Sequence, residues 1–535
     1  MSQSAGGFQR RLGLFDATML VAGSMIGSGI FIVSADISRD VGSSGWLILV
    51  WVLAGVLTII GALSYAELAS MMPTAGGQYV FLREAYGPLW GFLNGWTTFL
   101  VIQTGFLAAV GVAFAKFLGV LVPALGTGPD AYLFDPIAIN RVVEIPVPWM
   151  DEPMVFFKRE TFTISAGQLI ATGLVLFLAL INSFGIEQGR WVQNIFTVSK
   201  VAGLILLIVV GLTVAANGDA VQRNFSDIWG GIDDTKAYSE VWKFAPLTPV
   251  AIILVMSGAM VGALFSSDAW NNVTFIAGEV KQPERTLPWG LVLGTGMVIV
   301  LYVLANFAYL TALPMHGTDP KAVGENAALM RGIDHAKDDR VGTAVLEQVS
   351  PNLGVAAMAI IIMISTFGCN NGLTIMGARM YYAMAKDGLF FESCGKLNRF
   401  GVPAVGIWLQ ALWAIVLIFS GSYSELLDYI IFAALFFYIL TVGAVFVLRW
   451  RQPDAERPYR AWGYPVIPAF YLIVCAIIMI SLLFAKPVYS WPSFLIVLSG
   501  IPVYFVWSMN RRTPPRGSDQ ADSSAIAAGW PGIKP

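Results

Sequence analysis

Charged residues are scarce in this chain of 535 residues, since only 12% are Asp, Glu, Lys or Arg while 56% are hydrophobic. A soluble globular domain carries about 25% charged residues. A chain of this length with so little charge cannot cover a water-exposed surface. The composition therefore argues against a soluble enzyme, a nucleic-acid-binding protein and a disordered scaffold. The formal net charge of −2 says little about partners until the charges are placed along the chain.

Cysteine and histidine are also rare, with three and two residues respectively. Cys369, Cys394 and Cys475 form no CxxC pair and are too few for a disulfide framework. His316 and His335 share one polar stretch, and no cysteine accompanies them to complete a zinc set. We therefore expect no metal site and no cofactor, and we interpret both histidines as solvated loop residues.

Long hydrophobic segments are abundant. A helix needs about 20 apolar residues to cross the hydrocarbon core of a bilayer. Open sheet edges are not tolerated in lipid, and the segments lack the strict alternation of an outer-membrane barrel. The sequence predicts an all-α integral membrane protein with twelve transmembrane helices, at 12–36, 45–71, 88–120, 164–183, 191–216, 247–277, 288–313, 352–385, 403–421, 424–449, 464–485 and 491–509.

The charges favour one orientation. With the N-terminal segment 1–11 inside, the cytoplasmic loops carry an excess of Lys and Arg, including Arg10, Arg379 and Arg451, as the positive-inside rule requires. We predict a multi-pass protein of the plasma (inner) membrane with both termini cytoplasmic. The tail at 510–535 is poor in bulky apolar residues, so we predict that it is disordered.

Three long segments fall on the predicted outer side, at 121–163, 217–246 and 314–351. They are acidic, contain proline and show no strong periodicity. We interpret them as a solvated external cap. Docking of a partner is the alternative, but nothing specific in the sequence supports it.

The hydrophobic pattern breaks first in the sequence VAGSMIGSGIFIVS at 21–34, where Gly23, Gly27 and Gly29 fall close together. A glycine in a helix interior costs about 1 kcal/mol relative to alanine, so three glycines predict an unwound stretch. The alternative is close helix packing, because Gly23 and Gly27 have the GxxxG spacing.

The second break is ALFSSDAWNNVTFIAGEV at 263–280, which places Asp268 and four Ser and Asn residues inside an apolar run. An ionisable group at membrane depth costs several kcal/mol and usually has a function. A charge near a helix end that reaches the interface is the alternative. The apolar residues on both sides of Asp268 favour a position in the middle of the span.

The breaks lie in the first and sixth predicted spans, which is typical of an inverted repeat of five helices plus five. The first repeat would cover 12–216 and the second 247–449, followed by two further spans in 464–509. Free N–H groups at a half-helix start suit a carboxylate, and unwound carbonyls suit an ammonium group. Together the two breaks predict a receptor for a zwitterion such as an α-amino acid.

The segments around these breaks resemble the amino acid–polyamine–organocation (APC) superfamily of transporters, in particular its L-type, light-subunit-like branch. The resemblance implies a leucine-transporter-like fold with helices 1 and 6 broken, and sodium-independent transport of L-amino acids by exchange or with protons. It is carried by GSMIGSGIF (23–31), GALSYAELASMMPTAGGQYVFLREAYGPLWGFLNGW (61–96), FSSDAWNNVTFIAGEVKQPERTLP (265–288) and STFGCNNG (365–372).

The resemblance also implies a substrate site at the two breaks. The glycine-rich turn would hold the substrate carboxylate, the carbonyls at the breaks would meet its amine, and Phe265 would form an aromatic gate. The implied substrate-binding residues are Met25, Ile26, Gly27, Ser28, Gly29, Phe265, Ser266, Ser267, Asp268, Trp270 and Asn271.

Asp268 departs from the main L-type pattern, in which a glycine is usual. One interpretation is attraction for a cationic substrate side chain. The other is an N-cap that accepts backbone N–H groups of the second half-helix. The sequence therefore does not decide whether the substrate has a neutral or a cationic side chain.

Lys200 lies roughly 13 Å into the fifth predicted span. It is either a lysine that reaches the cytoplasmic interface or, as the resemblance implies, a cation directed at the first break in place of the sodium ion of sodium-coupled relatives. Ser365 and Thr366 either bond back to their own helix or take part in a cation site.

Rival functions remain. A membrane enzyme would need a nucleophile–base set, a metal cluster or paired carboxylates, which the spans lack. A receptor that senses amino acids and a sodium-coupled transporter of the same fold are the alternatives. A major-facilitator fold would not predict breaks in spans one and six. Animal L-type light subunits use a cysteine after span three to join a heavy subunit, and 121–163 has none, so we expect no disulfide-linked partner and no nucleic acid.

Overall fold

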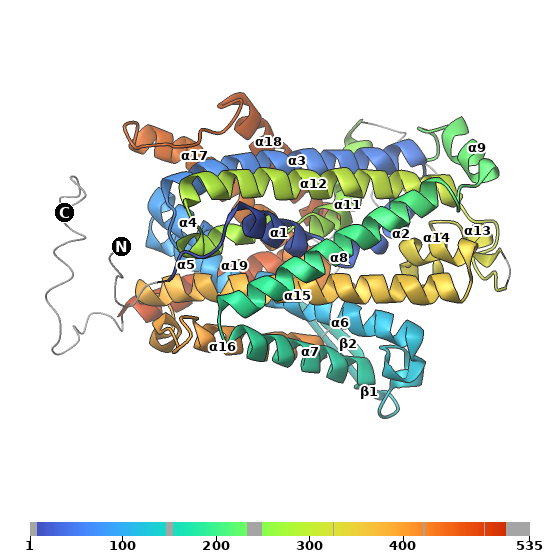
Figure 1. Ribbon diagram of the computed structural model, residues 1–535, viewed down its shortest axis with the longest axis horizontal. Coiled ribbons are helices and arrows are strands. Elements are labelled where there is room, and N and C mark those ends of the chain that lie inside the picture. The colour runs from blue at the N-terminus through green and yellow to red at the C-terminus, as the bar shows by residue number, and fades with distance from the viewer. Residues whose placement is uncertain are drawn as a thin grey trace, which may run out of the picture.

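The computed structural model describes residues 8–145, 154–232, 249–324, 326–420, 423–485 and 487–509. This part of the chain is a bundle of helices (Figure 1). Nine of the described helices are long and apolar enough to cross a membrane, judged by length and composition. The prediction of an all-helical membrane protein is confirmed, whereas the count of twelve spans stays a prediction.

The nine long spans are formed by these elements: α3 (Ser44–Met71), α5 (Pro88–Thr97) joined to α6 (Gln103–Leu121) by the π-helical turn η2 (Thr98–Ile102), α8 (Ile186–Leu212), α11 (Pro249–Ser266) with the 3-10 helix η5 (Trp270–Glu279), α12 (Pro283–Ala312), α15 (Leu353–Lys386), α17 (Tyr423–Arg451), α18 (Val466–Ala485) and α19 (Pro487–Met509). Three shorter apolar helices, α1 (Leu14–Met25), α7 (Ala166–Asn182) and α16 (Ala404–Ser420), fall in the remaining predicted spans.

The first predicted span is divided. Helix α1 ends at Met25, the backbone at Ile26 is extended, and the 3-10 turn η1 (Gly29–Phe31) leads into α2 (Ser34–Val41). Gly23 lies before this interruption, and a Cβ there would approach the Thr197 hydroxyl to 2.2 Å. The glycines therefore serve both purposes considered above, since Gly23 permits close packing against α8 and the chain unwinds after it.

The sixth predicted span is divided as well. Helix α11 ends at Ser266, and η5 begins at Trp270 after a short connection. Ala269 in that connection has a left-handed backbone with φ of 66°, which an alanine rarely adopts. Such strained positions concentrate at functional sites.

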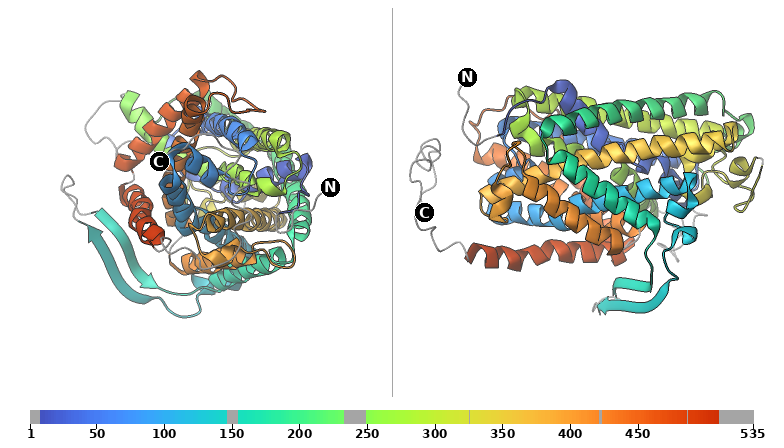
Figure 2. Two further views of the ribbon diagram at one scale, coloured as in Figure 1. Left: turned by 90° about the vertical axis from the view of Figure 1, so that its left-hand side faces the viewer. Right: turned by 60° about the horizontal axis from the view of Figure 1, so that its bottom comes forward.

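The two divided helices lie inside the bundle. Helix α1 packs against α8, α12 and α15, while α3 runs beside α12 and α6 beside α15 (Figure 1). Helices α18 and α19 lie at the periphery (Figure 2). Helix α1 begins and α19 ends at one end of the bundle, and α9 (Gly218–Ser226), α13 (Ala327–Arg331) and α14 (Val341–Val349) lie at the opposite end (Figure 1).

The long connections contain regular structure that the sequence did not predict. Strands β1 (Ile137–Ile145) and β2 (Met154–Phe162) form an antiparallel hairpin in 121–163, with Ile137 opposite Phe162. It projects from the side of the bundle beside α19 (Figure 2). Two register shifts interrupt the pairing, so no clean alternation marks the strands in the sequence. Residues 233–246 and the tail at 510–535 lie outside the described part.

Candidate functional site

The two helix breaks touch each other. A Cβ at Gly29 would lie 2.2 Å from Ser266 Oγ and 3.1 Å from Ser266 Cα, so only glycine permits this approach. The Tyr302 hydroxyl, from α12, lies 3.1 Å from the carbonyl oxygens of both Met25 and Ser266. The residues that the sequence assigned to one site, from Met25 to Gly29 and from Phe265 to Ser267, are therefore neighbours and are buried.

Lys200 enters the break of the first span from α8. Its side chain is fully buried, and its ammonium group donates to the carbonyls of Gly23, Ile26 and Ser365, the last two at 2.8 and 3.1 Å. The last carbonyls of a helix have no intrahelical donor, and the helix dipole makes that end favourable for a cation. Lys200 thus lies at the end of α1 and not at an interface.

Helix α15 supplies further donors to the same carbonyls. Ser365 Oγ lies 3.0 Å from the Ile26 oxygen and 2.9 Å from the Gly27 oxygen, whereas Thr366 bonds back to its own helix at Ile362, at 2.9 Å. The Thr366 hydroxyl therefore bonds back to its own helix, whereas the Ser365 hydroxyl contacts the break of the first span. Cys369 Sγ lies 3.0 Å from the Ser24 oxygen.

The start of η1 lies next to these carbonyls. The Phe31 N–H donates to the Ser28 carbonyl at 3.1 Å, which closes the first turn of η1. The N–H groups before that turn have no acceptor within the helix. Ser28 and Gly29 are buried. The break therefore presents backbone donors at one side and carbonyls, with Lys200 attached, at the other.

Phe265 closes one side of the break in the sixth span. Its ring stacks on Phe106 of α6 at a centroid distance of 5.0 Å and an angle of 15°. The Ser267 hydroxyl beside it is buried and has no hydrogen-bond partner within the described part of the chain. Buried hydroxyls without a partner are rare, so Ser267 is available to a bound molecule.

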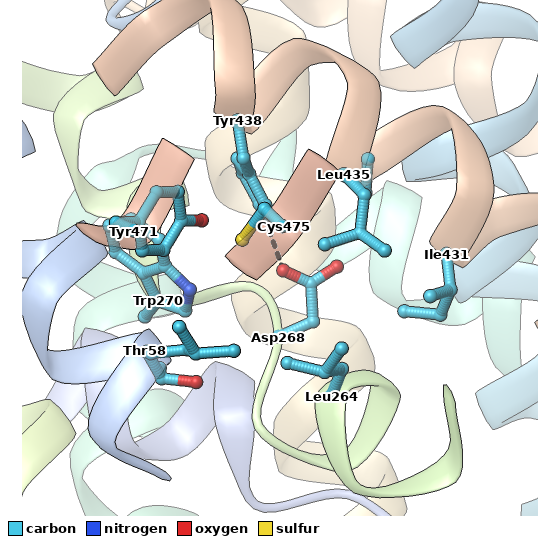
Figure 3. Close-up of a pocket in the computed structure, with 11 residues that line it drawn as sticks. Thr58, Leu264, Asp268, Trp270, Ile431, Leu435, Tyr438, Tyr471 and Cys475 are labelled. Carbon is cyan, nitrogen blue, oxygen red and sulfur yellow. Dashed lines mark hydrogen bonds between the residues drawn. The ribbon is translucent and has the colours of Figure 1, made fainter. Parts of the chain in front are cut away.

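Asp268 points away from the first break. Its buried carboxylate accepts a hydrogen bond from the Tyr438 hydroxyl of α17 and lines a small cavity of about 20 Å³ (Figure 3). None of the 11 lining residues of this cavity belongs to α1. Residue Ala269, which precedes η5, has no side-chain cap. The Asp268 carboxylate also accepts a hydrogen bond from the Ala269 N–H, so both interpretations of Asp268 stay predictions.

Aromatic rings surround this carboxylate. The rings of Trp270 and Tyr438 lie 5.4 Å apart, and Tyr65 of α3 contacts both, at 4.7 and 6.0 Å (Figure 3 shows Trp270 and Tyr438). Asn271 Nδ2 donates to Gln78 Oε1 at 3.2 Å. Trp270 and Asn271 thus belong to a buried cluster with Asp268.

Sequence reasoning did not find Tyr302, Tyr438, Gln78 or Gln103. Gln103 accepts from Asn272 at 3.2 Å and donates to the Leu373 carbonyl at 2.7 Å, which ties η5 to α6 and α15. A single Tyr or Gln in an apolar span has no local pattern that distinguishes it. The one available signal was that a glutamine inside a span is uncommon.

Comparisons with known proteins agree over nearly the whole chain. A family model described as amino acid permease matches residues 12–507. The chain is 28% identical over 508 residues to the serine/threonine exchanger SteT of Bacillus subtilis, covering 94% of this chain and 98% of that protein. It is 27% identical over 506 residues to the b(0,+)-type amino acid transporter 1 of Mus musculus, covering 93% and 88%. It is 25% identical over 507 residues to the human cystine/glutamate transporter, covering 95% and 87%.

Proposed function

We propose that this chain, which belongs to the amino acid permease family, carries L-amino acids across the plasma membrane by alternating access. The relatives named above are transporters and not enzymes. It works without sodium, as an exchanger or together with protons. Both termini are cytoplasmic, in line with the basic inner loops.

One observation carries the sodium-independent part of this proposal. The ammonium group of Lys200 lies on the carbonyls of Gly23, Ile26 and Ser365, which are the type of ligand that a sodium ion would use. A second cation about 4 Å from this ammonium group is repelled by roughly 4 kcal/mol at an effective dielectric constant of about 20. Lys200 is thus a resident cation that neutralises the carbonyl end of α1.

The substrate binds between the two breaks. Its carboxylate meets the glycine-rich turn at Gly27, Ser28 and Gly29. Its amine meets carbonyls at the two breaks, which lie on α1 and α11. Ser267 offers its unpartnered hydroxyl, and Phe265 covers the site.

Ion pairs at both ends of the bundle support alternating access. Arg379 and Glu279, both almost fully buried, pair at 2.7 Å near the end where α1 begins. At the opposite end Arg39 of α2 pairs with Asp339 at 2.9 Å. Each pair joins elements that have to separate when that end of the site opens.

Asp268 sets the side-chain preference. In the electrostatic interpretation the carboxylate favours a substrate side chain that is cationic or donates hydrogen bonds, whereas in the capping interpretation its role is structural. Tyr438 holds the carboxylate until the substrate competes for it. All three cysteines are buried, which is consistent with a transporter that has no disulfide-linked heavy subunit.

Counterflow in proteoliposomes tests the proposal. Vesicles preloaded with one unlabelled amino acid at a time are diluted into a labelled one, with sodium and pH varied. We expect accumulation for a subset of amino acids at the same rate with and without sodium. Binding without any accumulation would instead identify a receptor that senses amino acids.

A further inference from the structure

The connection between α12 and α14 folds onto the end of α2. The Ile333 and Asp334 N–H groups donate to the carbonyls of Pro314 and Met315, at 2.9 and 3.1 Å. These hydrogen bonds hold the beginning and the end of this connection together. Arg39 of α2 donates to the Asp334 carbonyl. This connection is therefore the part of the structure that fastens α2 at the end of the bundle opposite the start of α1.

His316 makes a second attachment. Its Nδ1 lies 3.1 Å from Asp334 Oδ2, and its Nε2 lies 2.8 Å from the carbonyl oxygen of Gly42. Both partners are acceptors, and a neutral imidazole has only one N–H, whereas imidazolium has two. Only protonated His316 satisfies both contacts. Gly42 ends α2, and the C-terminal end of a helix favours a positive charge.

Further charged groups contact Asp334 and α2. Asp334 also accepts from His335 Nδ1 at 2.9 Å and from the Gly317 N–H at 3.1 Å. On α2, Arg39 is neutralised by the carboxylates of Asp36 and Asp339.

The electrostatics agree with this geometry. The hydrogen bond to Asp334 raises the pKa of His316 above its ordinary value near 6.5; burial opposes the shift, and the contact with Gly42 adds to it. Burial opposes a low pKa for Asp334, but the hydrogen bonds from His316 and His335 lower it. The His316 side chain is 58% exposed, so the pH of the surrounding water acts on it directly.

We propose that His316 is a pH-sensitive latch that holds α2 closed at the outer end of the bundle when protonated and releases it when neutral. The proposal rests on the proposed function in one respect, namely that α2 has to move when the site opens outward. Because the pKa in the latched state is raised, the stabilisation is complete below the ordinary histidine pKa and is lost as pH rises through the raised value.

The chain offers a direct test, because it contains two histidines. In the full-length protein in nanodiscs, NMR of isotope-labelled histidine gives two imidazole titrations, and His335→Gln assigns them. We expect His316 to titrate above the ordinary value and hydrogen exchange of α2, corrected for intrinsic rates, to accelerate over the same pH range. Titration of His316 at or below the ordinary value, or exchange of α2 that does not follow it, overturns the latch.

Transport gives the second arm. Between about pH 5 and about pH 8, initial uptake should rise roughly 2- to 30-fold more in the wild type than in His316→Gln, the range that a charge at a helix end supplies. His335→Gln leaves both contacts of His316 in place, so uptake in this variant should still rise with pH more than in His316→Gln. Equal profiles for the wild type and His316→Gln overturn the proposal.

A third variant, Asp334→Asn, tests the latch without replacing His316 and is therefore useful if His316→Gln does not fold. Asp334→Asn keeps the histidine but removes the carboxylate that raises its pKa, so the transition in exchange of α2 should move to lower pH. An unchanged transition contradicts the latch. If α2 follows the titration of His316 but no amino acid is transported, the latch stands and the proposed function fails.

Discussion

The two helix breaks lie next to buried charges of opposite sign, and the two charges have different hydrogen-bond partners. At the first break, Lys200 donates to the Gly23 and Ile26 carbonyls at the end of α1 and to the Ser365 carbonyl of α15. At the second, Asp268 is held by one hydroxyl, that of Tyr438, beside a small cavity. The cation satisfies backbone carbonyls of the site, whereas the carboxylate lies beside a cavity with room for about one water molecule. Lys200 should therefore matter for every substrate and Asp268 for the choice among substrates.

The largest expected effect is that of Lys200→Ala. It removes the hydrogen bonds from a charged donor to the Gly23, Ile26 and Ser365 carbonyls, and a hydrogen bond to a charged group contributes about 1.5–3 kcal/mol. We expect uptake of all substrates to fall by roughly 100-fold or more. The measurement is counterflow beside a thermal unfolding curve, and Lys321→Ala on the exposed connection is the control. Wild-type uptake in Lys200→Ala would remove the lysine from the mechanism.

Gly29→Ala tests whether the two breaks have to touch. The added Cβ would lie 2.2 Å from Ser266 Oγ, and overpacking of this kind costs about 1–3 kcal/mol. We expect substrate affinity to fall roughly 10- to 100-fold, measured by binding of labelled amino acid. Gly296→Ala in α12 is the matched control, because nothing lies within 4 Å of its new Cβ. Equal affinities in both variants would contradict the contact.

Asp268→Asn tests the other side of the comparison. A hydrogen bond to a charged group contributes about 1.5–3 kcal/mol, so uptake of a cationic amino acid should fall roughly 10-fold or more while a neutral one changes little. Competition between the two in the same vesicles measures the ratio. Equal loss for both substrates would assign Asp268 a structural role.

The smallest effect is expected for Tyr302→Phe. It removes one hydroxyl that lies 3.1 Å from carbonyls of both breaks, and a net hydrogen bond contributes about 0.5–1.5 kcal/mol. Uptake should fall roughly 2- to 10-fold for all substrates. A selective effect on cationic substrates alone would show that Tyr302 belongs with Asp268 and not with Lys200.

The sequence predicts the two helix breaks and the two buried charges of the site, because these residues are unfavourable in an apolar transmembrane helix. Three clustered glycines cannot sustain a helix, and Asp268 and Lys200 are charges inside apolar segments. Each of these residues costs free energy in such a helix, so the sequence alone identifies it as unusual before its spatial neighbours are known. The burial of Lys200 and the interruption of α1 and α11 follow from these signals.

The remaining features depend on contacts between distant segments. Nothing in the sequence near Tyr438 indicates that its hydroxyl meets Asp268. His316 was interpreted as a solvated loop residue, yet its ring reaches Gly42 at the end of α2. The hairpin of β1 and β2 was not predicted because its register shifts hide the alternation.

The most direct test of the account is counterflow of a labelled amino acid in proteoliposomes, for the wild type and Lys200→Ala, each with and without sodium. The account predicts wild-type accumulation that is unaffected by sodium and that disappears in Lys200→Ala. Accumulation in the wild type that requires sodium, or accumulation by Lys200→Ala at the wild-type rate, would contradict it.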